Sequence, residues 1–200
     1  MIKQFKVIVL SGLLMGGSIF LLPQIGGADV YKVDAVHSSL AFSISHLMVS
    51  RTTGVFNEYE GAINFDPKDA ASSSAEVTIQ AASIDTRSTK RDEHLRSADF
   101  FDTTTYPQIT FKSKKFVPSG DQYMITGDLT MKGVTKEITV PIKITGPVAS
   151  PMGGEVLGLS GQLAINRQDF GISWNKNLDN GGLMVGNDVD VQINLEAHKQ

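Results

Sequence analysis

The sequence predicts an all-β domain of eight antiparallel strands, closed as an up-and-down barrel or packed as a sandwich. Eight short segments alternate apolar and polar residues, which is typical of strands with one buried face. Most are separated by turn residues, such as Asp-Pro at 66–67, Gly-Pro at 146–147 and Asn-Gly-Gly at 180–182. No long helical pattern separates them, so we expect neighbouring strands to pair in antiparallel fashion.

Each segment places its aliphatic and aromatic residues at every second position. The clearest case is 138–144, where Ile, Val, Ile and Ile alternate with Thr, Pro and Lys. The eight segments are residues 40–44, 63–65, 77–81, 109–111, 123–131, 138–144, 157–165 and 189–195. Gly127 and Gly161 share the inward parity of their segments, and we expect these small residues to leave room inside the barrel.

One segment departs from the alternating pattern. Residues 89–99 are predicted to form a helix, because Thr89 and Asp92 have the spacing of a capping box. Asp92 and Arg96 are spaced for a favourable ion pair one helical turn apart. We expect this short helix to cover one mouth or one side of the barrel.

Composition and charge indicate a single exported domain. The chain has 200 residues, no Cys and a formal net charge of −3, which argues against nucleic acid as its main partner. Two Lys near the N-terminus, an apolar run over 7–22 and Gly-Gly-Ala at 26–28 predict a cleaved signal peptide over residues 1–28. The apolar run is shorter than a membrane-spanning helix requires. The remaining residues, 29–200, are expected to form one domain.

The sequence contains no recognisable catalytic motif. It lacks a thiol, a Walker loop, a dinucleotide-binding glycine pattern, HExxH and GxSxG. Asp34, His37 and Ser38 suggest a hydrolytic triad, but neighbours in a strand point to opposite faces. Asp92 and His94 are too few to form a metal site. We therefore predict a protein that is not an enzyme and needs neither a metal nor a cofactor.

Three polar residues are candidates for contact with a ligand. His46 continues an inward-facing parity, so it either orients a ligand head at the barrel mouth or is a rim histidine bonded to its neighbours. Arg91 and His94 lie near the predicted helix start, where they could hold a pyrophosphate or another anion. Four basic and four acidic residues over 85–99 favour an ion-paired, solvated helix instead.

With these residues in view, the chain resembles the YceI family of lipocalin-like bacterial proteins. The most specific match is RDEHLRSADFFD over residues 91–102, followed by YPQITF over 106–111. GDLTMKGVT over 127–135 and NRQDFGI over 166–172 also match. Shorter matching stretches are residues 34–38, 42–46, 54–56 and 83–86. Together they span nearly the whole of the predicted mature chain in the family's order.

The resemblance implies a lipocalin-like, eight-stranded up-and-down barrel with one short helix and an elongated apolar channel. It also implies a periplasmic location and the binding of polyisoprenoids, such as prenyl pyrophosphates or quinones, or of similar long amphiphiles. We predict that the protein sequesters or carries such a lipid. The residues predicted to line the channel are Leu40, Phe42, Ile44, Ile125, Leu129, Val140 and Leu159, and the candidates for the polar head are His46, Arg91 and His94.

Two other functions remain open from the sequence. The first is an interaction module, in which a filled barrel docks a membrane redox or stress partner through its outer face. The second is a hydrolase or isomerase acting on a lipid head, which requires a polar cluster inside the barrel that the alternation does not supply. The identity of the lipid, transient membrane contact and a homodimer are also left open.

Overall fold

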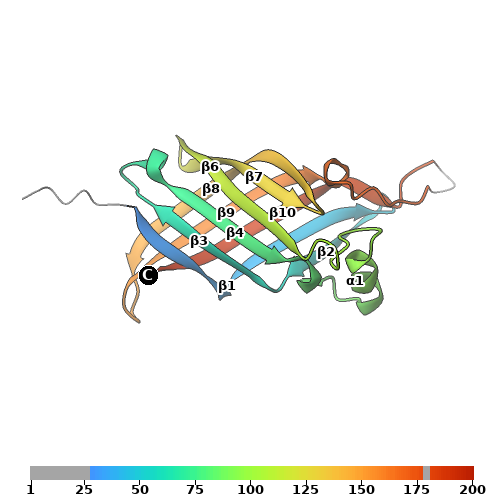
Figure 1. Cartoon of the computed structure of the whole chain (residues 1–200), viewed down its shortest axis with the longest axis horizontal. Helices are drawn as coiled ribbons and strands as arrows, with labels where there is room; N and C mark the ends of the chain where they lie inside the picture. Colours follow the sequence, from blue (N-terminus) through green and yellow to red (C-terminus); the bar gives the residue numbers. More distant parts are fainter. Residues whose placement is uncertain (1–27, 178–180) are drawn as a thin grey trace, which may run out of the picture.

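The computed structural model describes residues 28–177 and 181–200, which form one sheet rolled into an elongated barrel (Figure 1). Residues 1–27 lie outside the described part, so the signal peptide over 1–28 stays a prediction. The strands are β1 (Asp29–His46), β2 (Ser50–Phe56), β3 (Tyr59–Phe65), β4 (Ser74–Gln80), β5 (Ile84–Asp85), β6 (Gln108–Ser119), β7 (Gln122–Met131), β8 (Val134–Ala149), β9 (Glu155–Asn166) and β10 (Val185–Lys199). The helices are η1 (Ala70–Ser72), η2 (Ala81–Ser83), α1 (Thr89–Arg96) and η3 (Arg167–Phe170).

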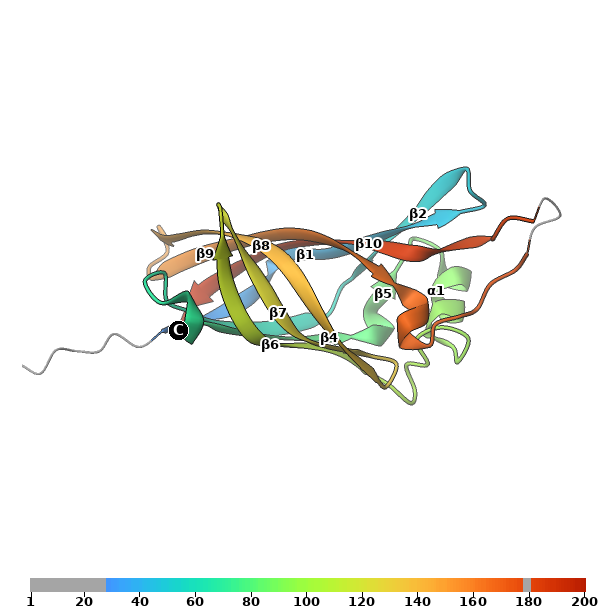
Figure 2. The same ribbon diagram turned by 90° about the horizontal axis from the view of Figure 1, so that it is seen from above.

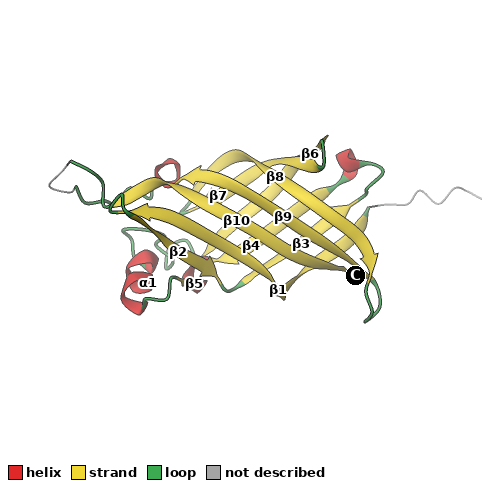
Figure 3. Ribbon diagram, turned by 180° about the vertical axis from the view of Figure 1, so that it is seen from behind, coloured by secondary structure: helices red, strands yellow, loops and turns green. Residues whose placement is uncertain are grey.

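Eight of these strands form a closed antiparallel barrel. They are hydrogen-bonded in the order β10, β9, β8, β7, β6, β4, β3 and β1, and β1 pairs again with β10. Viewed from behind, the strands cross the barrel obliquely (Figure 3). This is the predicted eight-stranded up-and-down barrel, and its closure excludes the sandwich. Each of the eight predicted segments overlaps a different one of these strands.

The sequence pattern does not predict β2 and β5. The first half of β1 pairs with β3, as in Tyr31 with Ile63, and its second half pairs with β2, as in Leu40 with Phe56. β2 and β3 are therefore two halves of one long, interrupted strand. β5 continues β4 beyond η2 in the same way and pairs with β2. β2 was missed because residues 50–54, Ser-Arg-Thr-Thr-Gly, contain no apolar side chain to mark a buried face.

The buried hydrophobic residues form two clusters. One includes side chains from the start of β1 and β9, where Tyr31 and Leu157 are at most 1% exposed. The other lies at the end that carries α1 and η3, and it includes Phe100, Met131 and Phe170. The first cluster consists of strand residues, whereas the second combines residues of β6 and β7 with residues of helices and loops.

α1 is shorter than predicted and begins differently. It ends at Arg96, whereas the sequence predicted a helix over 89–99. The N-cap residue is Ser88, and no side-chain hydrogen bond caps this helix end, so the predicted capping box is wrong. The carboxylate of Asp92 is instead used in a buried contact described below. No helix in the described ranges is long and apolar enough to cross a membrane.

The interpretation of Gly127 and Gly161 as residues that leave room in the barrel is wrong. A Cβ atom built on Gly127 would lie 2.5 Å from the carbonyl oxygen of Lys112, and one built on Gly161 would collide with the carbonyl oxygen of Pro141. The absent side chains therefore allow β6 to approach β7, and β8 to approach β9. They do not enlarge the interior.

Gly161→Ala is expected to destabilise the fold by about 1–3 kcal/mol, because the added methyl group meets main-chain atoms that cannot rotate away. The matched control is Gly158→Ala in the same strand, where a Cβ would lie 3.9 Å from Thr145 and fits without movement. Urea denaturation followed by circular dichroism measures both free energies of unfolding. Equal losses in the two variants would contradict the close-packing explanation.

Candidate functional site

The barrel encloses a cavity with a volume of about 260 Å³. Its wall reaches from Ile142 and Leu195, toward the end where the chain terminates, to Leu95 and Ile172 beside α1 and η3. Of the 31 residues in the wall, Arg167 is the only one that is not apolar, within the part of the chain that the structure describes. The period-two alternation produces this wall, because it turns polar side chains outward and apolar ones inward along each strand.

All seven residues that the sequence predicted to line the channel lie in the cavity wall. They come from β1, β7, β8 and β9, and so from opposite sides of the barrel. They are Leu40, Phe42, Ile44, Ile125, Leu129, Val140 and Leu159. Their contact with a bound ligand stays a prediction.

Part of the cavity wall comes from residues outside the strands, whose orientation a period-two pattern cannot predict. Leu95 from α1, Phe101 from the following turns and Ile172 after η3 complete the cavity at this end of the barrel. Phe101 packs edge to face against Phe56 of β2, with ring centroids 5.8 Å apart. These contacts are set by how α1 folds back on the sheet, so the sequence pattern did not reveal them.

Buried hydrogen bonds fasten α1 to the turn before it. Asp92 is 6% exposed, and its carboxylate accepts from the backbone N–H and the hydroxyl of Thr86, at 2.9 and 2.5 Å. Arg91 donates to the hydroxyl and carbonyl oxygens of the same threonine, both at 2.7 Å. Arg96 donates to main-chain carbonyls of η2 and β5, at 2.7 and 2.8 Å. The predicted Asp92–Arg96 ion pair is therefore wrong.

None of the three residues proposed for the polar head lies in the cavity wall. His46 is the last residue of β1, where the β1–β2 hairpin begins to turn. Arg91 is engaged with the turn before α1, as described above. His94 bonds Asp99 at 2.9 Å, and its ring meets Trp174 edge to face at 4.9 Å. Arg91 and His94 thus make local structural contacts, and a role for them in holding a ligand head stays a prediction.

Among the residues that the structure describes, the polar side chain that reaches the cavity is that of Arg167. It is the first residue of η3 and is 4% exposed. Its Nε donates to the carbonyl oxygen of Gly186 at 2.8 Å, and its Nη1 donates to that of Ile172 at 2.7 Å. In the sequence, this residue is noted only as part of the family-matching run over 166–172. Because Arg167 lies in η3 and not in a strand, alternation does not predict whether its side chain points inward.

Comparison with known proteins identifies the family. The model of the YceI-like domain matches residues 31–197. This chain belongs to the YceI family. A UPF0312 protein of Staphylococcus aureus is 40% identical to it over 167 residues, which cover 83% of this chain and 95% of the relative.

Solved structures of other bacterial proteins share the same fold. BcnA of Burkholderia cenocepacia is 30% identical, with a TM-score of 0.73 over 82% of this chain and 98% of that one. The Campylobacter jejuni YceI protein is 32% identical, with a TM-score of 0.64 over 78% of this chain and 90% of that one. A polyisoprenoid-binding domain from Saccharophagus degradans is 18% identical, with a TM-score of 0.66 over 85% of this chain and 98% of that one, and shares the fold.

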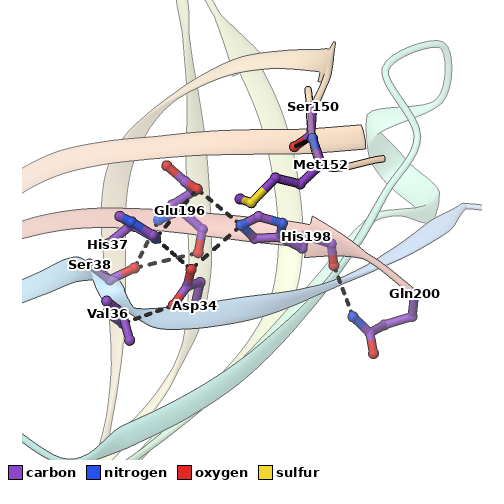
Figure 4. A network of polar contacts seen from close by, with 9 residues as sticks. All are labelled: Asp34, Val36, His37, Ser38, Ser150, Met152, Glu196, His198 and Gln200. Atoms are coloured by element: carbon purple, nitrogen blue, oxygen red, sulfur yellow. Dashed lines mark hydrogen bonds and ion pairs between the residues drawn. The ribbon is translucent and has the colours of Figure 1, made fainter. Parts of the chain in front are cut away.

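A cluster of titratable side chains lies outside the cavity of this YceI-family barrel, where β1 meets β10 (Figure 4). Asp34 Oδ2 is 2.7 Å from His37 Nδ1 and 3.6 Å from His198 Nε2, which is 3.0 Å from Glu196 Oε1. Ser38 accepts from the backbone N–H of Glu196 at 2.9 Å. Ligand atoms of Asp34, Glu196 and His198 lie within 4.8 Å of one another, a spacing that a metal ion could bridge.

This surface cluster predicts a pH-dependent contribution to stability. The hydrogen bond to Asp34 raises the pKa of His37 above 6.5, and the same bond lowers the pKa of Asp34 below 3.8. The His37 contribution is complete below its ordinary pKa and is lost as pH rises through the raised value. The Asp34 contribution is present above its ordinary pKa and is lost as pH falls through the lowered value.

His37→Asn is therefore expected to reduce the loss of melting temperature that the unmodified protein shows between about pH 6 and about pH 8. Differential scanning calorimetry across that interval measures the slope. Val36→Ala, at the neighbouring exposed position, is the control and should retain the original slope. Identical slopes in the His37 variant and the unmodified protein would rule out this pair as the source of the pH dependence.

Asp92→Ala is expected to destabilise the fold by about 2–3 kcal/mol, because it leaves the buried donors of Thr86 without their acceptor. Glu93→Ala is the control at the next, exposed position of α1. Thermal denaturation gives the stability of both variants, and hydrogen exchange reports the opening of α1. Unchanged exchange of the α1 amides in the Asp92 variant would contradict the anchoring role.

Proposed function

We infer that this YceI-family protein binds a long apolar ligand of the polyisoprenoid class inside its barrel. The observation that carries this proposal is the cavity wall, in which every described residue except Arg167 is apolar. Such a wall cannot hydrogen-bond a polar molecule along its length, but it can bury a hydrocarbon chain. The wall reaches from Leu195, near the end of β10, to Leu95 of α1 and Ile172 after η3, so it extends along the barrel, as an extended chain requires.

Burial of the chain supplies the binding free energy. Each buried CH₂ group contributes about 0.8 kcal/mol, so ten such groups contribute about 8 kcal/mol before the cost of association is subtracted. An extended lipid therefore needs few polar contacts to bind. The Saccharophagus degradans domain of the same fold is described as polyisoprenoid-binding, which supports a lipid of this class here.

Binding without catalysis is part of the proposal. The carboxylates and imidazoles described above lie outside the cavity wall, and a guanidinium such as that of Arg167 keeps its proton at ordinary pH. Acid–base chemistry on a ligand would need a group that exchanges a proton near neutrality. Sequestration or carriage of the lipid is therefore the function that this site supports best. A periplasmic location, inferred from residues 1–28, would suit a carrier, and membrane contact and a homodimer stay predictions.

The protein purified without detergent is expected to release a long-chain isoprenoid on extraction with organic solvent, detected by mass spectrometry. It should also take up added geranylgeraniol, measured by displacement of a fluorescent lipid. Recovery of no long-chain lipid, together with no uptake, would refute the proposal and favour the interaction module.

Filling the cavity provides a second test. Val140 is 6% exposed and lies in the wall, whereas Val148 in the same strand is 58% exposed. Val140→Phe is expected to weaken geranylgeraniol binding about tenfold or more, because the larger ring occupies space that the chain needs. Val148→Phe is the matched control and should retain the original affinity. Calorimetry of both variants confirms that they remain folded, and equal affinities would exclude the cavity as the binding site.

A further inference from the structure

Arg167 is a buried cation in a cavity wall whose other described residues are apolar. It begins η3, which connects β9 to the segment leading into β10 at the end of the barrel that carries α1 (Figure 2). Its side chain is held by two carbonyl oxygens, those of Gly186 and Ile172, through Nε and Nη1. Neither acceptor is a carboxylate, so these bonds orient the guanidinium without neutralising its charge.

The remaining nitrogen of this guanidinium has no partner within residues 28–177 and 181–200. Nη2 of Arg167 is buried and makes no hydrogen bond to any described residue. Burial lowers the pKa of Arg167, and no neighbouring acid in the described chain offsets that effect. A buried cationic donor without a partner is costly, so a group that supplies an acceptor is expected beside it.

A second unpaired polar atom lies close by in the sequence of β10. Asn187 follows Gly186, whose carbonyl oxygen Arg167 binds, and the Oδ1 atom of Asn187 is also buried without a partner among the described residues. Asn187 lies between Val185 and Val189, which both line the cavity, although Asn187 is not itself part of the wall and the pairing of β1 with β10 is irregular here. Unsatisfied polar atoms are therefore concentrated where η3 and β10 meet.

We propose that Arg167 Nη2 binds the head group of the lipid, and that this head is an oxyanion, a carboxylate or a phosphate. The inference rests on the proposed function and adds to it the orientation and the chemical class of the ligand. The head lies at the end of the barrel that carries α1, and the chain extends from there toward the cluster around Tyr31 and Leu157. An oxyanion supplies both the missing acceptor and the missing negative charge, whereas an alcohol supplies only an acceptor.

The proposed oxyanion head is tested on the unmodified protein with ligands that have the same isoprenoid tail but different head groups. Geranylgeranoic acid and geranylgeranyl phosphate are compared with geranylgeraniol and its methyl ether by displacement of a fluorescent lipid. Because a charge-assisted hydrogen bond strengthens binding, at least one of the two anions is expected to bind about 10- to 100-fold more tightly than the ether. A preference for only one anion would distinguish a carboxylate head from a phosphate head.

The outcomes separate this inference from the function on which it rests. Equal affinities for the anions, the alcohol and the ether would overturn the role of Arg167 and leave an apolar carrier. A preference for the alcohol over both anions would overturn it as well. Binding of none of the four compounds would refute the proposed function itself.

Substitution of Arg167 assigns the preference to this residue. Arg167→Met is expected to remove the preference for the anion over the ether while the affinity for the ether changes little. Arg51→Met is the control, because Arg51 is exposed and pairs with Asp190 on the outer surface. A retained anion preference in a folded Arg167→Met variant would refute the assignment.

A spectroscopic measurement keeps the test decisive if Arg167→Met does not fold. The side-chain ¹⁵N signals of Arg167 in the unmodified protein, assigned with Arg167→Lys or by through-bond correlation, are followed while geranylgeranoic acid is added. A shift of these signals with the acid, and a smaller one with the ether, is expected. The same shift with both ligands would contradict a bond to the head group.

Discussion

Pairing of β1 with β10 is the interaction on which the rest of the structure depends. It joins the two ends of the sheet, so the inner faces of eight strands surround a space instead of packing against a second layer. Every second side chain of each strand then points into that space. Because those positions are almost all apolar, closure and alternation together produce a dry interior suited to hydrocarbon.

The end of the barrel that carries α1 is built by a different principle. Here the long strands are interrupted, and β2 and β5 are short continuations of β3 and β4. α1 and the turns that follow it cover the remaining wall with Leu95 and Phe101. Apolar contact alone would leave their position poorly determined, so directional bonds are needed. The buried carboxylate of Asp92 and its donors on Thr86 supply them.

Charged side chains have different partners inside the barrel and on its outer surface. Outside, the carboxylates of Asp34 and Glu196 are paired with histidines in a solvated cluster. Inside, Arg167 is oriented by main-chain carbonyls, and one of its donors is unused by the residues that the structure describes. The surface cluster supplies its own hydrogen-bond partners, whereas Arg167 lacks a partner for Nη2 among the described residues. This difference is why we assign the ligand head to Arg167 and not to the more numerous polar residues outside.

The sequence by itself determined the eight barrel strands, their inward faces and much of the cavity wall. Alternation is a local property of each strand, so residues such as Leu40, Val140 and Leu159 could be assigned to the interior without knowledge of their partners. Closure of the sheet could not be derived in this way, because a sandwich and a barrel share the same pattern, and only the resemblance to the YceI family favoured the barrel.

Only the tertiary structure decided the contacts that join distant parts of the chain outside the regular strands. Asp92 was expected to pair along its own helix, but it bonds Thr86 in the preceding turn. Gly161 was expected to leave space, but Pro141 of the neighbouring strand occupies it. The side chain of Arg167 is oriented by its hydrogen bonds to the carbonyl oxygens of Gly186 in β10 and Ile172 after η3. A periodic pattern in the sequence cannot predict these contacts, because Arg167 and Ile172 lie outside the regular strands.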